Sequence, residues 1–141
     1  MIQLEIEFVE WRPIPGFSKY SASSDGRIPR EVAGQGARAG WVLKPWWAGN
    51  NRGYRYVQIV DDFDKIRKAR VCVLVCSAFQ GRRPAGHECD HRDTDTANDT
   101  ADNLRWLPDT INALLGSYKR WGRPVDDIEY AGVAREAGDP F

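Results

Sequence analysis

Residues 89–112 read CDHRDTDTANDTADNLRWLPDTIN, and the organisation of the chain can be worked out from them. Two short segments, 88–92 and 104–107, flank a polar loop and have the length and composition of paired strands. Asp109 is a good N-cap, so a helix is predicted to begin just after the second strand. The apolar face of this helix is made by Ile111, Leu114 and Leu115.

The same segment contains the residue types needed for metal-assisted hydrolysis. Asp90 and Asn112 offer hard oxygen donors, which Mg²⁺ prefers. His91 follows Asp90 directly, and an imidazole with an ordinary pKa of about 6.5 accepts a proton from water near neutral pH. One metal ion and one base suffice to hydrolyse a phosphodiester bond. Taken alone, an Asp–His pair is more often a surface hydrogen-bonded pair.

The charge distribution leaves room for a nucleic-acid partner. The 141 residues fit one domain, or one small domain with an extension, and carry 20 basic and 20 acidic side chains. The acidic excess lies in residues 89–110 and 124–141, and the rest of the chain has eight more basic than acidic groups. DNA binding is therefore not excluded by overall neutrality.

The apolar runs and the spacing of the cysteines bear on membrane association, cellular location and a structural zinc site. No apolar run is long enough for a membrane span, and residues 2–8 alternate apolar and polar side chains as a strand does, unlike a signal peptide. We therefore expect no membrane partner. Cys72, Cys76 and Cys89 form no Cys-x-x-Cys pair, which favours buried free thiols in a reducing, cytoplasmic setting and makes a structural zinc site unlikely.

The residues before 71 are predicted to be rich in β-structure. Pro13, Pro15 and Gly16 exclude a regular element over residues 10–17, and the Gly- and Ala-rich segment 32–40 is predicted to be a loop. Strands are predicted at 2–8, on both sides of an Asp25-Gly26 turn in 20–28, at 41–47, at 54–60, and in a hairpin leading to residue 71. The apolar run Val71–Phe79 fits a strand or a short buried helix ending at Gly81, and local pattern does not decide.

The chain resembles the HNH endonucleases of the phage and homing-endonuclease type. The resemblance rests on RRPAGHECDHRD (82–93), Asn98, NLRW (103–106) and Asn112, and on EWRPIPGF (10–17) with YSASSDGRI (20–28), which resembles a DNA-binding module often fused ahead of that motif. It implies an α+β fold, with N-terminal antiparallel β-hairpins followed by a ββα-metal (His-Me finger, HNH) motif, and favours the helix over 71–79. The implied domains are a β-rich DNA-binding module (1–70), the nuclease motif (71–123) and an acidic C-terminal tail (124–141).

The resemblance also implies roles for single residues. His91 takes the position of the water-activating base, and Asp90 and Asn112 take those of the metal ligands. Asn103 takes the position of the catalytic-site residue that orients the loop and holds the base. Two positions depart from the family pattern: Cys72 stands where a His is usual, and Thr94 stands where a Gly is usual.

The function expected from this resemblance is a divalent-metal-dependent HNH DNA endonuclease, encoded by a phage or mobile element and acting in the host cytoplasm. We expect Mg²⁺ or Mn²⁺ as cofactor, DNA as partner, nicking or double-strand cutting, and a monomer or weak homodimer. The alternative is a DNA-binding protein on an HNH scaffold with weak or vestigial cleavage. Strands 41–47 and 54–60 are the best candidates to lie in a DNA groove. The basic residues expected to contact phosphates are Arg27, Arg30, Arg52, Arg55, Lys68, Arg70, Arg82, Arg83, Lys119 and Arg120.

Overall fold

The computed structural model describes residues 8–34, 38–48, 53–112 and 114. Several predictions therefore lie outside the described residues: almost all of the strand at 2–8, the phosphate contacts of Arg52, Lys119 and Arg120, and the tail 124–141. No helix within the described part of the chain is long and apolar enough to cross a membrane.

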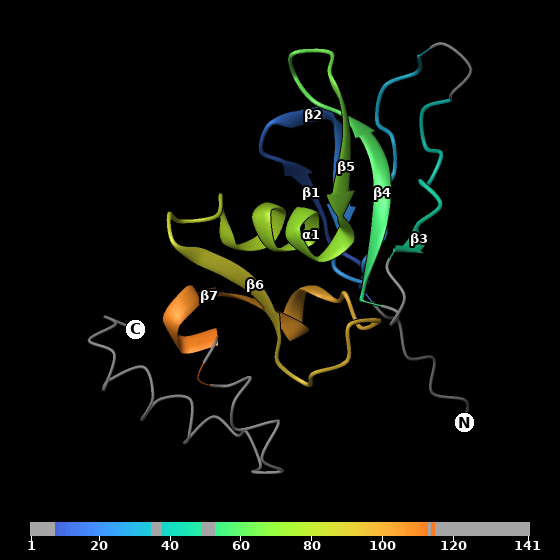
Figure 1. The fold of residues 1–141 in the computed structure, drawn as a ribbon. Helices are drawn as coiled ribbons and strands as arrows, with labels where there is room; N and C mark the ends of the chain where they lie inside the picture. Colours follow the sequence, from blue (N-terminus) through green and yellow to red (C-terminus); the bar gives the residue numbers. More distant parts are fainter. Residues whose placement is uncertain (1–7, 35–37, 49–52, 113, 115–141) are drawn as a thin grey trace, which may run out of the picture.

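The described part of the chain forms three small antiparallel sheets around a central helix (Figure 1). The first sheet pairs two strands, the second has three strands in chain order, and the third is a two-stranded hairpin. This architecture confirms the predicted α+β fold with antiparallel hairpins. The elements in order are β1 (Trp11–Ile14), β2 (Phe17–Ser23), β3 (Trp46–Ala48), β4 (Tyr54–Val60), β5 (Ile66–Arg70), α1 (Val71–Gln80), β6 (His87–His91), a short 3₁₀ helix (Ala101–Asn103) and β7 (Leu104–Pro108).

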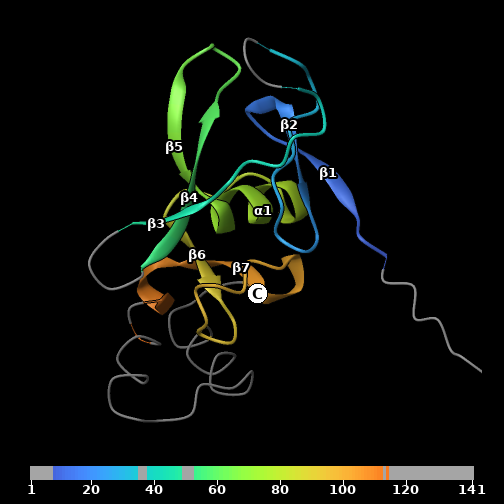
Figure 2. The ribbon, with the colours of Figure 1, turned by 90° about the vertical axis from the view of Figure 1, so that its right-hand side faces the viewer.

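Helix α1 is the centre of the fold. It packs against β1 and β2, against β4 and β5, and against the β6–β7 hairpin, which Figure 2 shows beneath it. Val71, Leu74 and Val75 are each at most 2% exposed, so the apolar run does form a buried helix, as the family resemblance favoured. The helix ends at Gly81, whose φ of +85° is easily adopted only by a residue without a side chain.

The prediction that residues 10–17 form no regular element is wrong, because Trp11–Ile14 is strand β1. Pro13 is accommodated because β1 pairs with β2 alone and the register shifts between Pro13 and Ile14. A proline on an edge strand removes no hydrogen bond that a second neighbour would need. Gly16, with φ of +83°, then closes the tight connection to β2.

The hairpin predicted within 20–28 is only half formed. Its first strand is the end of β2, but the return after the Asp25-Gly26 turn is not a strand. The side chain of Ser23 accounts for this, because its Oγ accepts the backbone N–H of Arg27 at 2.8 Å and also contacts Asp25. A side chain thus takes up a backbone group that a regular ladder would use.

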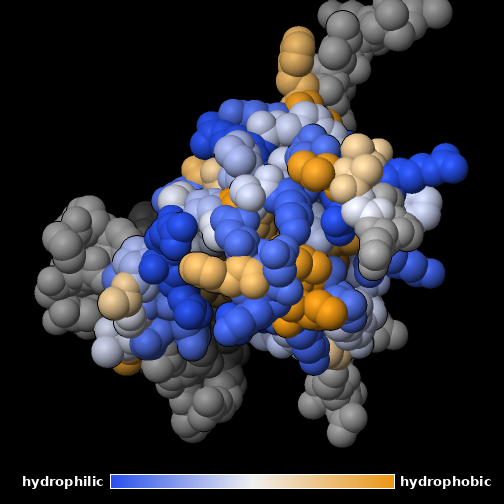
Figure 3. All heavy atoms as spheres, turned by 90° about the horizontal axis from the view of Figure 1, so that it is seen from above, coloured by the Kyte–Doolittle hydropathy of each residue, from blue (hydrophilic) through white to orange (hydrophobic). Residues whose placement is uncertain are grey.

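The second sheet follows the predictions more closely. Strand β4 coincides with the predicted strand 54–60, and the predicted hairpin into residue 71 is β4–β5. The strand predicted at 41–47 is reduced to β3, Trp46–Ala48. Residues 42–45 lack a ladder of backbone hydrogen bonds apart from an isolated bridge between Val42 and Pro29. Seen from above, the surface is mainly hydrophilic, and its apolar side chains form small separate groups (Figure 3).

Candidate active site

A small cavity lies where strand β4 meets the β6–β7 hairpin and the first turn of the following helix. Its volume is about 90 Å³. Residues 109–112 are helical, as predicted, and bring Asn112 to this cavity from beyond β7. Three of the four residues expected in the catalytic centre line it together. The lining residues are Tyr54, Cys89, Asp90, His91, Thr94, Thr96 and Asn112.

The two expected metal ligands are each held by a neighbour. Asp90 is 6% exposed and its Oδ2 accepts a hydrogen bond from Arg105 Nε at 2.9 Å across the hairpin. Asn112 donates from Nδ2 to Glu88 Oε2 at 2.8 Å, which fixes the amide so that its carbonyl oxygen is the atom left for a ligand role. The hydroxyls of Thr94 and Thr96 lie in the same lining, so Asp90 and Asn112 are accompanied by further oxygen donors. Such a set fits Mg²⁺ or Mn²⁺.

His91 is held tightly on one side of the cavity. Its side chain is 4% exposed, and Nε2 lies 2.7 Å from Asp99 Oδ1. The ring of Tyr54 stacks against the imidazole, with centroids 6.0 Å apart and an angle of 27° between the planes. An ionised carboxylate only accepts hydrogen bonds, so Nε2 carries a proton and the neutral ring keeps its lone pair on Nδ1.

The pKa of His91 is raised above its ordinary value of 6.5. Burial acts to lower the pKa of His91, but the hydrogen bond with Asp99 and the negative charges around the ring outweigh it. The expectation of a mostly neutral ring at pH 7 rested on the ordinary pKa. The protein alone therefore favours the imidazolium more than expected, and a cation bound beside Asp90 would act in the opposite direction.

Asn103 organises the loop between β6 and β7. It is 8% exposed, and its Nδ2 donates to Asp93 Oδ1 at 2.9 Å and to the Asn98 carbonyl oxygen at 2.8 Å. Its Oδ1 accepts the backbone N–H of Asp93 at 3.0 Å. One amide thus ties both limbs of the loop together. The backbone carbonyl oxygen of Asn103 also accepts the N–H of Arg92, the residue after His91, at 2.8 Å.

Asp99 is the buried polar residue of the site that sequence reasoning missed. It is 3% exposed, and besides His91 it binds Arg55, whose Nε and Nη2 lie 2.9 and 2.8 Å from Asp99 Oδ2. In the sequence Asp99 is one of several carboxylates in a polar loop without periodicity, so nothing distinguishes it. Asp99 stands out only in the folded structure, where Arg55, 44 residues earlier in the chain, binds its carboxylate.

The described basic residues predicted to bind DNA have different surroundings. Arg27 pairs with Asp25 at 3.0 Å, and Arg30 donates to the Val32 carbonyl oxygen at 2.6 Å. Arg55 points inward to Asp99. Lys68 and Arg70 lie over the rings of Tyr56 and Tyr54, at 4.3 and 4.8 Å from their centroids, and Arg82 and Arg83 are exposed just beyond α1.

The three cysteines are buried and none is in a disulfide. Cys72 lies in the interior beside His91, and one ligand atom each from Cys72, His91 and Asp99 falls within 4.8 Å of the others. The hydrogen bond with Cys89 and burial raise the pKa of the Cys72 thiol, so it is protonated at neutral pH. His91 and Asp99 are already hydrogen-bonded to one another, and the Cys72 thiol packs beside them.

The comparisons with known proteins agree with this geometry. Residues 70–114 match the family model described as HNH endonuclease, which confirms the predicted resemblance for that segment. The fold is similar to that of the HNH homing endonuclease I-HmuI, in a structure concerned with DNA binding and cleavage by that enzyme. The TM-score is 0.62 and the identity 24%, over 89% of this chain and 66% of that one. No curated protein sequence gives a significant match.

Proposed function

We propose that this chain, whose residues 70–114 carry an HNH endonuclease motif, is a divalent-metal-dependent endonuclease that hydrolyses phosphodiester bonds of DNA in the cytoplasm. One observation carries the proposal: Asp90, His91 and Asn112, drawn from a strand and from the helix beyond the next strand, line one small cavity. Their positions match the ligand, base and ligand order expected of the motif. Because the described part of the chain holds one cavity lined by these three residues, the expected product of a monomer is a nick.

Asp90, His91 and Asn112 each have a defined task in the proposed reaction. Asp90 and Asn112 would hold Mg²⁺ or Mn²⁺, which when bound supplies positive charge to stabilise the phosphate and the leaving oxygen. His91 accepts a proton from the attacking water at Nδ1, because Nε2 is engaged with Asp99. Arg105 keeps the Asp90 carboxylate oriented through its hydrogen bond to Oδ2.

The outer face of the second sheet is the surface that we propose for DNA. Tyr56 lies opposite Trp46 on β3 and opposite Arg70 on β5, so these three side chains share one face. The Trp46 and Tyr56 rings stack with centroids 6.5 Å apart. Lys68 lies over Tyr56 on the same face. Basic groups interleaved with aromatic rings suit phosphates and exposed base or sugar surfaces.

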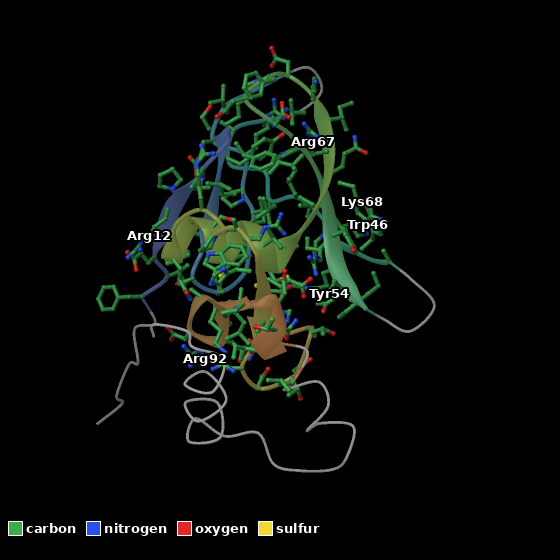
Figure 4. All side chains as sticks on the ribbon, turned by 60° about the vertical axis from the view of Figure 1, so that its left-hand side comes forward. Arg12, Trp46, Tyr54, Arg67, Lys68 and Arg92 are labelled. Atoms are coloured by element: carbon green, nitrogen blue, oxygen red, sulfur yellow. The ribbon has the colours of Figure 1, made fainter. Side chains whose placement is uncertain are left out.

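This face leads toward the cavity. Arg70 lies over Tyr54, and Tyr54 in turn stacks on His91, so rings and basic groups run continuously from the sheet to the base. Figure 4 shows Lys68, Trp46 and Tyr54 following one another along the sheet toward the β6–β7 hairpin. A DNA strand that crosses this face of the sheet would reach Asp90 and His91. Contacts of this kind depend strongly on salt and carry little sequence information.

Plasmid nicking tests the proposal. Wild-type protein is expected to convert supercoiled plasmid DNA to the nicked form in the presence of Mg²⁺ or Mn²⁺, and this conversion is expected to be abolished by excess chelator. His91→Ala is expected to reduce the rate by at least about 100-fold, because the proton acceptor is lost, while DNA affinity stays within about threefold. Full activity in chelator, or equal loss of binding and cleavage in His91→Ala, contradicts the assigned roles.

The second candidate function is DNA binding with weak or vestigial cleavage. The observation that favours it is the 4% exposure of His91, which leaves little of the ring open to solvent. The nicking assay separates the two candidates when it is combined with a binding measurement. Salt-dependent DNA binding by a wild-type protein that fails to nick in either metal ion would establish the second.

A further inference from the structure

A buried row of three side chains connects strand β4 to the catalytic histidine. Arg55 on β4 binds Asp99 Oδ2 through two nitrogens, and Asp99 Oδ1 binds His91 Nε2 at 2.7 Å. The Asp99 side chain is 2% exposed and that of Arg55 is 24% exposed. We propose that Asp99, held by Arg55, is a positioning residue that fixes the His91 ring with its proton on Nε2, and so makes β4 part of the catalytic machinery. The proposal rests on the function proposed above.

The chemistry requires the proton to be on one particular nitrogen. A neutral imidazole has one N–H and one lone pair, and only the nitrogen with the lone pair accepts a proton from water. The Asp99 carboxylate accepts from Nε2–H and thereby leaves the lone pair on Nδ1. Arg55 matters because it occupies the other carboxylate oxygen with two donors, which stops the carboxylate from rotating.

The backbone around Asp99 is held as firmly as its side chain. The Ala101 N–H donates to the Ser24 carbonyl oxygen at 2.9 Å, so the turn after β2 touches the catalytic loop. A Cβ added at Gly26 would come within 2.9 Å of the Asp99 carbonyl oxygen. Gly26 also has φ of +89°, so only glycine fits this turn without strain. Two segments that precede the motif therefore surround Asp99: β4 binds its side chain through Arg55, and the turn after β2 packs against its backbone at Gly26.

It follows that the working site is larger than the recognised motif. The family match covers residues 70–114 and includes Asp99, but neither Arg55 nor Gly26 lies within it. Tyr54, which stacks on the ring of His91, lies outside it as well. Neighbouring residues of β4 thus confine the base in two ways, one by stacking and one through Asp99.

The decisive variant is Asp99→Asn, which keeps the shape of the side chain. Arg55 can only donate, so it selects the Asn carbonyl oxygen and turns the amide N–H₂ toward His91. His91 Nε2 must then accept, and the ring proton moves to Nδ1. We expect the single-turnover cleavage rate to fall by at least about 100-fold, because the nitrogen that must accept the proton from water now carries one. DNA affinity is expected to stay within about threefold of wild type.

The tautomer can be read directly by ¹⁵N-detected NMR of the imidazole rings at a pH where they are neutral. The chain has two histidines, so His87→Gln identifies the His91 signals. We expect the Nε2–H form in wild type and the Nδ1–H form in Asp99→Asn. An unchanged tautomer, or Asp99→Asn cleaving at the wild-type rate, overturns the proposal. The NMR result holds even if wild-type protein does not cut DNA, so failure here and failure of the proposed function are distinguishable.

Arg55→Ala and Arg67→Ala provide the second variant and its matched control. Arg67 pairs with Asp61 at 2.9 Å in the same sheet, so its removal also breaks an arginine–aspartate pair but leaves Asp99 untouched. Arg55→Ala is expected to lower the cleavage rate about tenfold or more with unchanged DNA affinity, and Arg67→Ala to leave the rate within about twofold. A weaker Kd and a smaller salt dependence in Arg55→Ala, with an unchanged rate, would make Arg55 a phosphate contact and overturn its positioning role.

Discussion

At the scale of single residues, Thr94 has a backbone conformation that its side chain disfavours. Its φ is +66°, in the left-handed region where β-branched residues are rarely found. The turn is nevertheless fixed, because the Thr94 N–H donates to the His91 carbonyl oxygen at 2.9 Å. The departure from glycine noted in the sequence therefore falls where the loop needs a glycine-like conformation, immediately beside the base.

Thr94→Gly is expected to raise the free energy of unfolding by about 1 kcal/mol, because glycine adopts this φ without the clash of a side chain. Urea unfolding of the two proteins measures the difference. Thr96→Gly is the control: it lines the same cavity, has no positive φ, and is expected to destabilise by about 0.5–1 kcal/mol. Equal destabilisation by both changes would show that Thr94 is not strained.

Also at this scale, the sequence predicted residues that the structure brings together at one cavity, but it did not predict the residues that hold them. Asp90, His91 and Asn112 follow from residue type and spacing, and they do line one cavity. Asp99 could not be predicted, because its importance depends on Arg55, far away in the sequence, and local patterns carry no information about such a contact. For the same reason Arg55, which looked like a phosphate contact, was not expected to face inward.

At the scale of elements, two differences from the expected strands have identifiable causes. Ser23 replaces a ladder with its own hydrogen bonds, and Pro13 is tolerated because β1 is an edge strand. The β4–β5 hairpin is organised similarly by Asp61, whose Oδ1 accepts the backbone N–H groups of Phe63 and Lys65, both at 2.9 Å. Hydrophobic alternation predicted β4 correctly because it does not depend on such contacts.

The β4–β5 hairpin predicts a pH dependence of stability. The hydrogen bond from Arg67, followed by those of Lys65 and Phe63, lowers the pKa of Asp61 below its ordinary value of 3.8. Since the folded pKa is the lower one, this carboxylate stabilises the fold above pH 3.8, and the contribution is lost as pH falls through the folded pKa. The Asp61→Asn protein is expected to be less stable than wild type at pH 6, and its free energy of unfolding is expected to change less with pH below about pH 4.

Urea unfolding between pH 2 and 6 measures this effect, and Asp102→Asn, which removes an exposed carboxylate, is the control. The control is expected to keep the acid dependence of the wild type. An Asp61→Asn protein whose stability falls with acid as steeply as that of the wild type would mean that another group is responsible.

At the scale of the whole molecule, the N-terminal strands and the HNH motif share one core. The buried cluster includes Ile14 from β1, Ile59 from β4, five of the ten residues of α1, and Trp106 from β7. The division into 1–70 and 71–123 stays a prediction, and in the described structure the two parts meet around α1. Common packing explains how β4, the strand that carries the candidate DNA surface, also confines His91.

The central claim is that Asp90 and Asn112 bind a common divalent cation beside His91. Titration of Mn²⁺ followed by electron paramagnetic resonance tests it most directly, with wild type, Asp90→Ala and Asn112→Ala compared, and with Glu10→Ala, which removes an exposed carboxylate, as control. We predict that each site variant binds Mn²⁺ at least about tenfold more weakly and that the control binds as wild type. Wild-type Mn²⁺ affinity in both Asp90→Ala and Asn112→Ala would contradict the claim.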